Sequence, residues 1–313
     1  MNPASNPRHR PALGIALILL MAACFASMDS TIRYLGAFLP VLLILWARYS
    51  FQALAMLIWL GSQALRGKPG QFRAAHPKFQ AVRGLLLLIT SAMSFYGVQY
   101  MPVAEFTAIN MLTPVVVTLL AATVLHERVS RLRWALVIGG FIGALIVIRP
   151  GSGLFGWAVL FPLAGALTYA SFQVLTAKLA ALESPYTTHF YTGMTGSVLL
   201  SLILAFGPFE VLAPLRAASA WQLGLIAFIG LLGTVGHLLL ILALGLAPTG
   251  TLMPFVYTQI AVAATIGYFV FGHAPDGYAW LGMGVLSACG ATSAWLNVRR
   301  SQQSPVSVDT IAD

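Results

Sequence analysis

The sequence predicts an all-α integral membrane protein with ten transmembrane helices, arranged as two inverted five-helix repeats. Three observations predict this fold class: an apolar composition, a row of long apolar segments, and a sequence pattern that occurs twice. Of the 313 residues, 59% are hydrophobic and only 8% are charged, and the mean hydropathy is +0.86. A soluble domain carries roughly 25% charged residues. This composition is typical of a chain that crosses a membrane many times.

Ten apolar segments are long enough to cross a bilayer as helices, since a helix needs about 20 apolar residues to span the hydrocarbon core. They are too long and too evenly apolar for the strands of a membrane barrel, which alternate over about ten residues. We therefore expect transmembrane helices over residues 12–32, 38–61, 81–100, 103–125, 133–149, 154–178, 187–206, 221–245, 250–271 and 277–298.

The net charge of +9 reports how the chain lies in the membrane, and we expect no nucleic-acid partner. With the N-terminus in the cytoplasm and ten alternating segments, Arg33, Arg149 and Arg216 fall on the opposite side, and Arg48 is buried. Cytoplasmic loops carry an excess of lysine and arginine, so both termini are expected there. The thirteen basic residues on the cytoplasmic side are Arg8, Arg10, Arg66, Lys68, Arg73, Lys78, Arg83, Arg128, Arg131, Arg133, Lys178, Arg299 and Arg300.

One stretch of the sequence occurs twice. Residues 100–134, YMPVAEFTAINMLTPVVVTLLAATVLHERVSRLRW, align without a gap with residues 246–280, LAPTGTLMPFVYTQIAVAATIGYFVFGHAPDGYAW. Each half then holds five segments, and an odd number gives the two halves opposite orientations in the membrane. Inverted repeats are typical of secondary transporters, whose binding site lies near the midplane between the halves.

The two halves divide at IRPGSG, residues 148–153, a stretch rich in turn-forming residues. We expect a cytoplasmic N-terminal tail over residues 1–11 and a first repeat over residues 12–150. The second repeat is expected over residues 151–298, followed by a polar cytoplasmic tail over residues 299–313.

Several motifs resemble those of the drug/metabolite transporter superfamily, specifically its EamA-type members. They are Y-x-P-V-A-x-x-T-A-I before the fourth segment's P-V-V-V-T-L-L-A-A, then L-H-E-R-V-S, G-x-x-G-A-L-I-V-I-R-P, MDSTIRYLG and ARYSFQAL. The resemblance covers residues 12–298. It implies two EamA repeats and a transporter of small metabolites in a bacterial cytoplasmic (inner) membrane. The second repeat departs from the pattern, because its FGHAP lacks the acid and base of HERVS.

Three charged residues stand inside apolar segments, where a charge near the bilayer centre costs roughly 2.5–3.5 kcal/mol. Asp29 and Arg33 lie four residues apart and share a helix face. Either Asp29 contributes to a substrate or proton site, or the pair fixes the first helix to the second through Arg48. Arg48 binds either a substrate carboxylate or phosphate, or Asp29 as its counter-ion.

Uncharged and terminal polar residues form a second group of candidates. Glu105 contacts substrate or stabilises the start of its helix through the helix dipole. His237 packs against a neighbouring helix or belongs to a proton relay. Tyr257 and Gln259 point to different sides of their helix, so at most one lines a cavity. The other candidates for substrate binding are Tyr96, Asn110, Tyr169 and Gln173.

The favoured function is secondary transport, because the sequence has no nucleotide-binding loop. A proton or ion gradient or exchange remains as the driving force, and Asp29 or His237 is the candidate proton carrier. An integral-membrane enzyme acting on a lipid-linked substrate is the alternative from another class. No spacing of metal ligands or cofactor motif supports it, and nothing resembles the filter of a channel.

The substrate is expected to be a small polar organic molecule, and its transport to need no cofactor. On the breadth of the family, export of an amino-acid-like or metal-chelating metabolite is favoured. The rival is uptake of a vitamin or nucleoside-like compound, such as riboflavin or adenosylmethionine. The sequence leaves the oligomeric state open.

Overall fold

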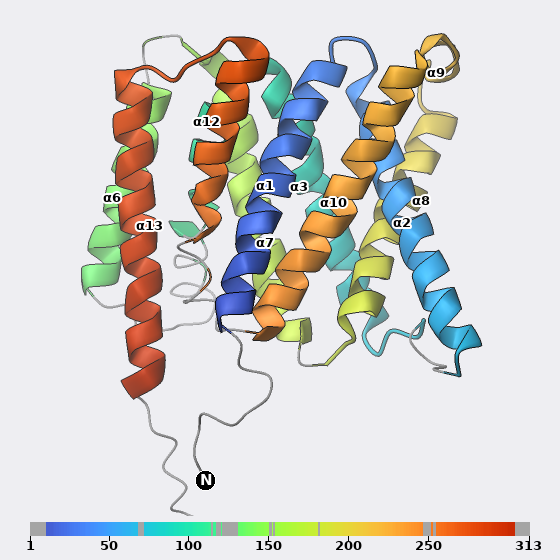
Figure 1. The fold of residues 1–313 in the computed structure, drawn as a ribbon, viewed down its shortest axis with the longest axis horizontal. Helices are drawn as coiled ribbons and strands as arrows, with labels where there is room; N and C mark the ends of the chain where they lie inside the picture. Colours follow the sequence, from blue (N-terminus) through green and yellow to red (C-terminus); the bar gives the residue numbers. More distant parts are fainter. Residues whose placement is uncertain are drawn as a thin grey trace, which may run out of the picture.

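The computed structural model describes residues 11–67, 72–113, 115–116, 120, 131–149, 152, 154–180, 182–246, 252 and 255–303. These residues form a bundle of helices and contain no β-strand (Figure 1). The prediction of an all-α membrane fold is confirmed. The L-H-E-R-V-S motif of the first repeat lies outside the described residues.

The first half of the chain contributes five helices to the described bundle, and the second half contributes the rest. The first five are α1 (Pro11–Leu35), α2 (Val41–Leu65), α3 (Pro77–Tyr100), α4 (Val103–Asn110) and α6 (Arg131–Ile148). The others are the 3₁₀ turn η2 (Gly156–Val159), α7 (Leu160–Ala180), α8 (Pro185–Phe206), α9 (Leu212–Ala217), α10 (Ala220–Leu246), α12 (Thr258–Phe271) and α13 (Gly277–Gln303).

Six described helices are long and apolar enough to cross a membrane, and two shorter apolar helices cover Trp134–Ile148 and Thr258–Phe271. The expected number of ten spans stays a prediction, since much of the expected fourth segment, residues 103–125, lies outside the described part. Local sequence sets several helix ends. Pro77 and Pro185 lie in the first turns of α3 and α8, where the missing N–H costs nothing. Gly272 ends α12 with a left-handed φ of 64°.

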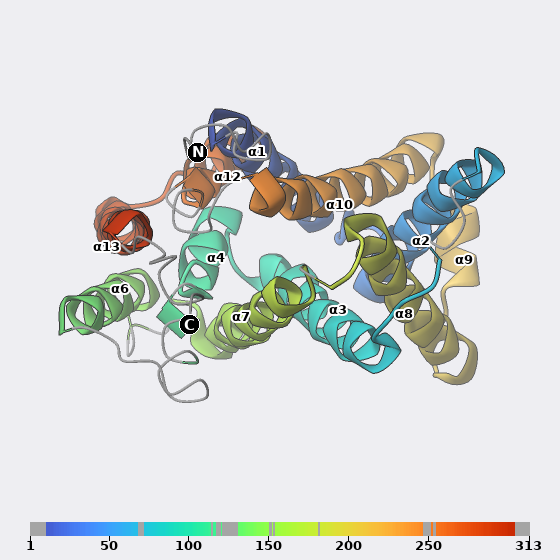
Figure 2. The ribbon, with the colours of Figure 1, turned by 90° about the horizontal axis from the view of Figure 1, so that it is seen from below.

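The first described helix, α1, begins at the same end of the bundle at which the last, α13, ends (Figure 1). In Figure 1, α1 begins and α13 ends at the lower end, which we call the lower end throughout. At the opposite, upper end, α1 and α3 end and α13 begins. Seen along the bundle, α1, α10 and α12 lie on one side and α3, α4 and α7 on the other (Figure 2).

The helix contacts follow the two-repeat pattern. If each helix of the first half is matched to its counterpart in the second, α1 corresponds to α7, α2 to α8, α3 to α10, α4 to α12 and α6 to α13. The contact of α1 with α10 then corresponds to that of α3 with α7, and the contact of α2 with α10 to that of α3 with α8. The contacts of α2 with α8, α4 with α12 and α6 with α13 each join a helix to its own counterpart in the other half. The packing is that of two related halves about a pseudo-twofold axis.

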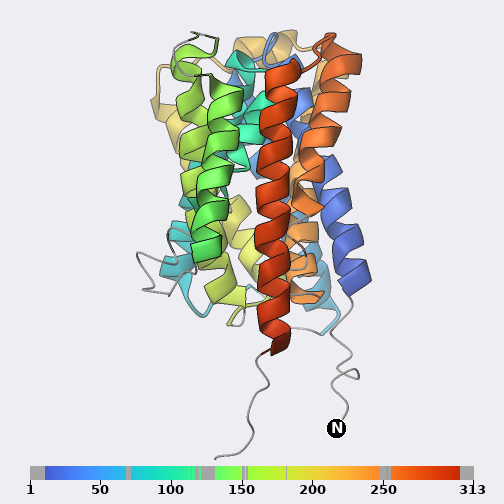
Figure 3. The ribbon, with the colours of Figure 1, turned by 90° about the vertical axis from the view of Figure 1, so that its left-hand side faces the viewer.

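Helices α6 and α13 form a close pair at one side of the bundle (Figure 3). A Cβ atom on Gly143 would lie 3.0 Å from the carbonyl oxygen of Gly282. A Cβ atom on Gly139 would lie 2.7 Å from Sγ of Cys289. Glycine at these positions lets the two backbones approach, as small residues do between membrane helices.

Candidate functional site

A cavity lies between the two sides of the bundle, near the middle of the helices. Its volume is about 80 Å³, more than a single buried water needs. Six of the ten residues expected from the sequence line it: Asp29, Arg48, Asn110, Tyr169, Gln173 and His237. They come from α1, α2, α4, α7 and α10, so both halves of the chain contribute. Methionine and aromatic side chains, among them Met21, Phe25 and Phe95, supply its apolar wall.

Arg48 is the most deeply buried charge at the cavity, with 1% of its surface exposed. Its Nη1 donates to Oγ of Ser91 at 3.3 Å, and its guanidinium lies 4.5 Å from the ring centre of Tyr49. Its Nη2 lies 3.3 Å from Nδ1 of His237. That nitrogen either accepts from Arg48 or donates to the carbonyl of Gly233 at 2.9 Å, depending on the tautomer. Neutral groups therefore hold the guanidinium in place.

The space for Arg48 depends on a glycine of the facing helix α10. A Cβ atom on Gly233 would lie 2.7 Å from Nε of Arg48. The same face carries Gly230 against Phe51 and His237 against Phe25, with ring centres 4.7 Å apart in the second pair. The glycines of GLLGTVGH thus seat α10 against α2 and leave room for a charged side chain.

Asp29 faces the same cavity from α1, with 5% of its surface exposed. Its Oδ1 accepts from Oγ of Ser94 at 3.2 Å. Among the described residues, no ion pair joins Asp29 to Arg48 or to Arg33. The expected structural pairing of Asp29 with either arginine is therefore absent, because each arginine is held by other groups.

Arg33 lies at the upper end, outside the cavity. Its Nη1 donates to the carbonyl oxygens of Val98, at 2.9 Å, and of Met101. Its guanidinium also lies 5.4 Å from the ring centre of Phe271. Gln99 adds a bond from α3 back to α1, from its Nε2 to the carbonyl oxygen of Ile32 at 3.0 Å. Arg33 therefore ties the ends of α1 and α3 together.

Three further candidates also lie outside the cavity lining. Tyr96 stacks on Phe161 with ring centres 6.4 Å apart. Tyr257 packs its ring against Gly290 of α13, and it is Gln259 that lines the cavity. This agrees with the expectation that at most one residue of this pair does so. Glu105 is buried at the start of α4, and its Oε1 lies 2.9 Å from Nε2 of His273.

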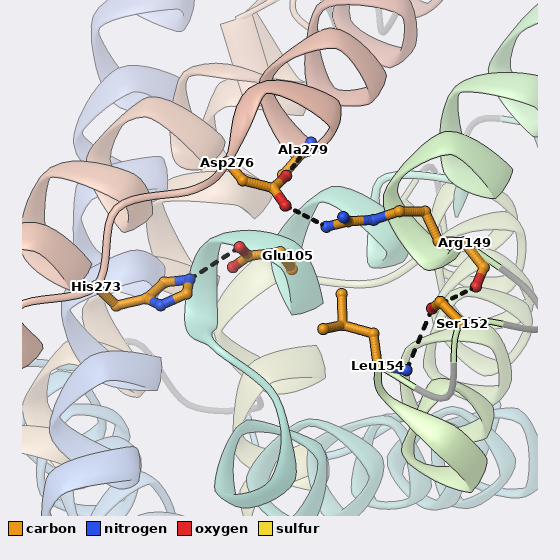
Figure 4. A network of polar contacts seen from close by, with 7 residues as sticks. All are labelled: Glu105, Arg149, Ser152, Leu154, His273, Asp276 and Ala279. Carbon is orange, nitrogen blue, oxygen red and sulfur yellow. Dashed lines mark hydrogen bonds and ion pairs between the residues drawn. The ribbon is translucent and has the colours of Figure 1, made fainter.

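Glu105 belongs to a polar network at the upper end (Figure 4). Beside its pair with His273, Arg149 lies 2.7 Å from Asp276. Asp276 also accepts from the backbone N–H of Ala279 at 2.9 Å. These two bonds lower the pKa of Asp276, which lies in the loop before α13. The network joins α4 and α6 to the segment between α12 and α13.

The structure corrects one assignment of the charge analysis. Arg83, counted among the basic residues of the cytoplasmic surface, is 1% exposed inside the bundle. Its Nε donates to Oγ1 of Thr176 at 2.7 Å, and its Nη1 donates to the carbonyl oxygen of Thr188 at 3.2 Å. The signal that could have identified it was its place within the expected segment 81–100.

Several lining residues were missed because they are small and common in membrane helices. Thr90, Ser91 and Ser94 line the cavity from α3. Ser91 and Ser94 are distinguished by their contacts with Arg48 and Asp29, whereas Thr90 bonds to the carbonyl of Leu86 in its own helix and to Thr168. In the described part of the chain, no three His, Cys, Asp or Glu side chains gather where they could hold a metal ion.

The polar atoms at the cavity include groups that a ligand could satisfy. Among the described residues, Nε of Arg48, a donor, and Oδ1 of Asn110, an acceptor, have no hydrogen-bond partner. A buried polar atom without a partner costs free energy. The cavity thus offers a cation, a carboxylate and at least one carbonyl oxygen to a molecule of suitable shape.

Comparison with known proteins gives a consistent result over nearly the whole chain. The profile of the EamA-like transporter family matches residues 12–149 and 156–293. A riboflavin transporter of Rhizobium johnstonii is 28% identical, covering 88% of this chain and 89% of its own. An S-adenosylmethionine uptake transporter of Rickettsia prowazekii is 25% identical, covering 84% and 86%. A pseudopaline exporter of Pseudomonas aeruginosa is also 25% identical, covering 84% and 89%.

Proposed function

Since the chain belongs to the EamA-like transporter family, and is a multi-pass membrane transporter of small molecules and not an enzyme, we propose which cargo it carries and how. The cargo is a small zwitterionic metabolite with an amino-acid-like end. The protein moves it across the bacterial cytoplasmic membrane as a secondary transporter, with both termini in the cytoplasm. The alternative of an enzyme acting on a lipid-linked substrate is set aside by the family.

The observation that carries this proposal is the separation of the two cavity charges. Asp29 and Arg48 line one cavity from different helices, and no ion pair joins them within the described residues. A buried charge is normally paired. A zwitterion supplies both missing partners at once, because its ammonium group can meet Asp29 while its carboxylate meets the forked guanidinium of Arg48. A singly charged cargo would satisfy only one of them.

The other lining residues would orient the rest of the cargo. Asn110, Gln173 and Gln259 offer amide groups, and Tyr169 offers a hydroxyl. The apolar wall of methionine and aromatic side chains suits the uncharged body of a metabolite. His237 and Asp29 are the proposed carriers if transport is coupled to protons, since both line the cavity.

Alternating access is supported by a difference between the two halves. At the upper end, α1 packs on α3 through Arg33 and Gln99. The corresponding contact in the second half, between α7 and α10, is weaker among the described residues. The halves are related repeats in opposite orientation. In a second conformation, α7 and α10 would therefore pack closely while α1 and α3 separate, which would close the lower end and open the upper end.

For direction, we propose export of an amino-acid-like or metal-chelating metabolite. The similarity to a pseudopaline exporter supports it. Uptake of a nucleoside-like or vitamin compound is the second candidate, supported by the similarity to the riboflavin transporter and the S-adenosylmethionine uptake transporter. Adenosylmethionine itself has an amino-acid end, so the proposed charge recognition is compatible with either direction.

The test is untargeted mass spectrometry of cells and medium from a deletion strain and its parent. An exported cargo accumulates inside the deletion strain and disappears from its medium. An imported cargo stays in the medium and is depleted inside. A cargo without both an amine and an acidic group would overturn the zwitterion proposal. No change in any compound under conditions where the parent expresses the protein would overturn the proposed transport of a metabolite.

A further inference from the structure

A second buried arginine lies beneath the cavity, and the proposed function does not use it. Arg83 precedes the cavity residue Leu87 by one turn of α3, on the side of the lower end. On α7, Thr176 follows the cavity residue Gln173 by three residues toward the same end. The bond from Arg83 to Thr176 therefore lies directly below the cavity wall that these two helices form.

The surroundings of Arg83 are polar but carry no opposite charge. Its guanidinium donates to Thr176, to the carbonyl of Thr188 and to Oγ1 of Thr192, and it lies 4.5 Å from the ring centre of Phe172. No carboxylate pairs with it among the described residues. Glu183, in the loop at the same end, binds the backbone N–H of His76 instead.

Unsatisfied amide oxygens accompany this arginine. Gln80, one turn before Arg83 on α3, donates from Nε2 to Thr188 at 3.1 Å, and its Oε1 has no partner among the described residues. Gln52, one turn after Arg48 on α2, donates to the carbonyl of His189 at 3.0 Å, and its Oε1 also lacks a described partner. Both glutamines are fully buried. We call Gln52, Gln80, Arg83, Thr176, Thr188 and Thr192 the lower polar cluster.

A buried cation held only by neutral groups is costly, because hydroxyls and carbonyls replace its hydration without neutralising its charge. Hydrogen bonds from position 83 to the threonines of α7 and α8 could hold the three helices together. A serine or glutamine at position 83 could make such bonds without burying a charge. An arginine is the side chain suited to a carboxylate that arrives and leaves. The uncharged oxygens of Gln52 and Gln80 can accept from an ammonium group without trapping it.

We propose that Arg83 is a second, transient binding point for the carboxylate of the cargo, between the cavity and the lower end of the bundle. The inference rests on the proposed function, since it assigns a step on the route of the same cargo. The carboxylate exchanges Arg48 for Arg83 as the cargo moves between the cavity and the lower end. The lower polar cluster therefore selects for cargo with an anionic group when the cargo enters or leaves at the lower end, and it has no such role at the upper end.

The experiment compares three variants of the full chain: Arg83→Gln, Arg83→Lys and the control Arg66→Gln. Arg66 is an exposed arginine just after α2, at the same end, so its replacement removes equal charge without entering the bundle. Each gene is returned to the deletion strain, and the cargo is identified by untargeted mass spectrometry. Transport of that compound is then measured in proteoliposomes from each side separately.

Arg83→Gln is expected to raise KM by roughly tenfold or more for cargo presented at the lower end, as loss of a charge-assisted contact does. KM from the upper end stays unchanged. Arg83→Lys retains part of the effect of the native residue, and Arg66→Gln behaves as the wild type. A purely structural role of Arg83 would change KM equally on both sides or lower the yield of folded protein, and either result overturns the inference.

The outcomes also separate this inference from the proposed function. A cargo that is transported but carries no anionic group overturns the role of Arg83 and leaves transport standing. A transported carboxylate whose kinetics are the same in Arg83→Gln and wild type, from both sides, also overturns it. If no compound depends on the protein, the proposed function fails first, and the step assigned to Arg83 falls with it.

Discussion

The cavity and the upper end of the bundle both contain acidic and basic side chains, but these side chains are paired with each other only at the upper end among the described residues. At the upper end, Glu105 pairs with His273 and Arg149 pairs with Asp276. In the cavity, Asp29 and Arg48 share a space but are bound only by neutral side chains within the described residues. The two charged pairs at the upper end satisfy each other, whereas the two cavity charges form no ion pair with one another among the described residues.

The two regions also differ in what their charges cost. Exposed ion pairs contribute little to stability, about 0–1 kcal/mol, so the Arg149–Asp276 pair can be lost without consequence for the fold. The cavity charges are buried, and burial of a charge is expensive unless a partner compensates. We infer that the cavity retains them for function, and substitutions in the two regions should therefore differ in their effect on transport.

Replacing either cavity charge should have the largest effect. Arg48→Ala and Asp29→Asn are each expected to lower transport about a hundredfold or more, because each removes the partner of one charged end of the cargo. Transport is measured in proteoliposomes, and insertion is checked by the amount of protein in the membrane. Arg149→Gln is the control for loss of an arginine outside the cavity. Normal transport in both cavity variants would contradict the assignment of the site.

A change next to Arg48 that leaves every charge intact should have the second largest effect. Gly233→Ala places a Cβ atom 2.7 Å from Nε of Arg48, so the guanidinium must shift. Transport is expected to fall about tenfold, as a displacement near 1 Å at a binding group can cause. The matched control is Gly224→Ala on the same helix, where a Cβ atom meets nothing within 4 Å. Equal activity of the two variants would show that the position of Arg48 is not critical.

Glu105 should matter for stability more than for transport. Glu105→Gln leaves a neutral hydrogen bond to His273 in place of a charged one, at a cost of about 1 kcal/mol. The thermal unfolding midpoint is expected to fall by roughly 2–4 °C, while KM for the cargo stays within twofold. The measurement is thermal unfolding of purified protein beside transport in proteoliposomes. A KM raised tenfold would instead make Glu105 part of the binding site.

The Arg149–Asp276 pair should show the smallest effect. Asp276→Asn is expected to change transport less than twofold, since the pair is exposed. Because the pKa of Asp276 is lowered in the folded protein, any stability it adds is present above the unfolded value near 3.9. That stability is lost as the pH falls through the lower folded value. Wild type and variant should therefore differ by a constant offset above about pH 5, and this offset should shrink as the pH falls below about 4.

The membrane fold, the family and most of the polar residues that line the cavity could be predicted from the sequence. Hydropathy and helix length are local properties, so the apolar segments could be recognised without a structure. The repeat at residues 100–134 and 246–280 predicted two related halves. Asp29, Arg48 and His237 were identifiable because a charged or titratable group inside an apolar segment is rare.

Which of these groups meet depends on how the helices pack and could not be predicted from the sequence. The rotation of each helix and the depth of each residue depend on neighbouring helices, and no local pattern reports them. Packing against α3 gave Arg33 backbone carbonyls as partners, and packing against α7 and α8 buried Arg83. Tyr257 packs against Gly290, and Gln259 lines the cavity in its place. Charge placement could be read along the chain, but charge pairing is a property of the assembled bundle, because it depends on distances between helices.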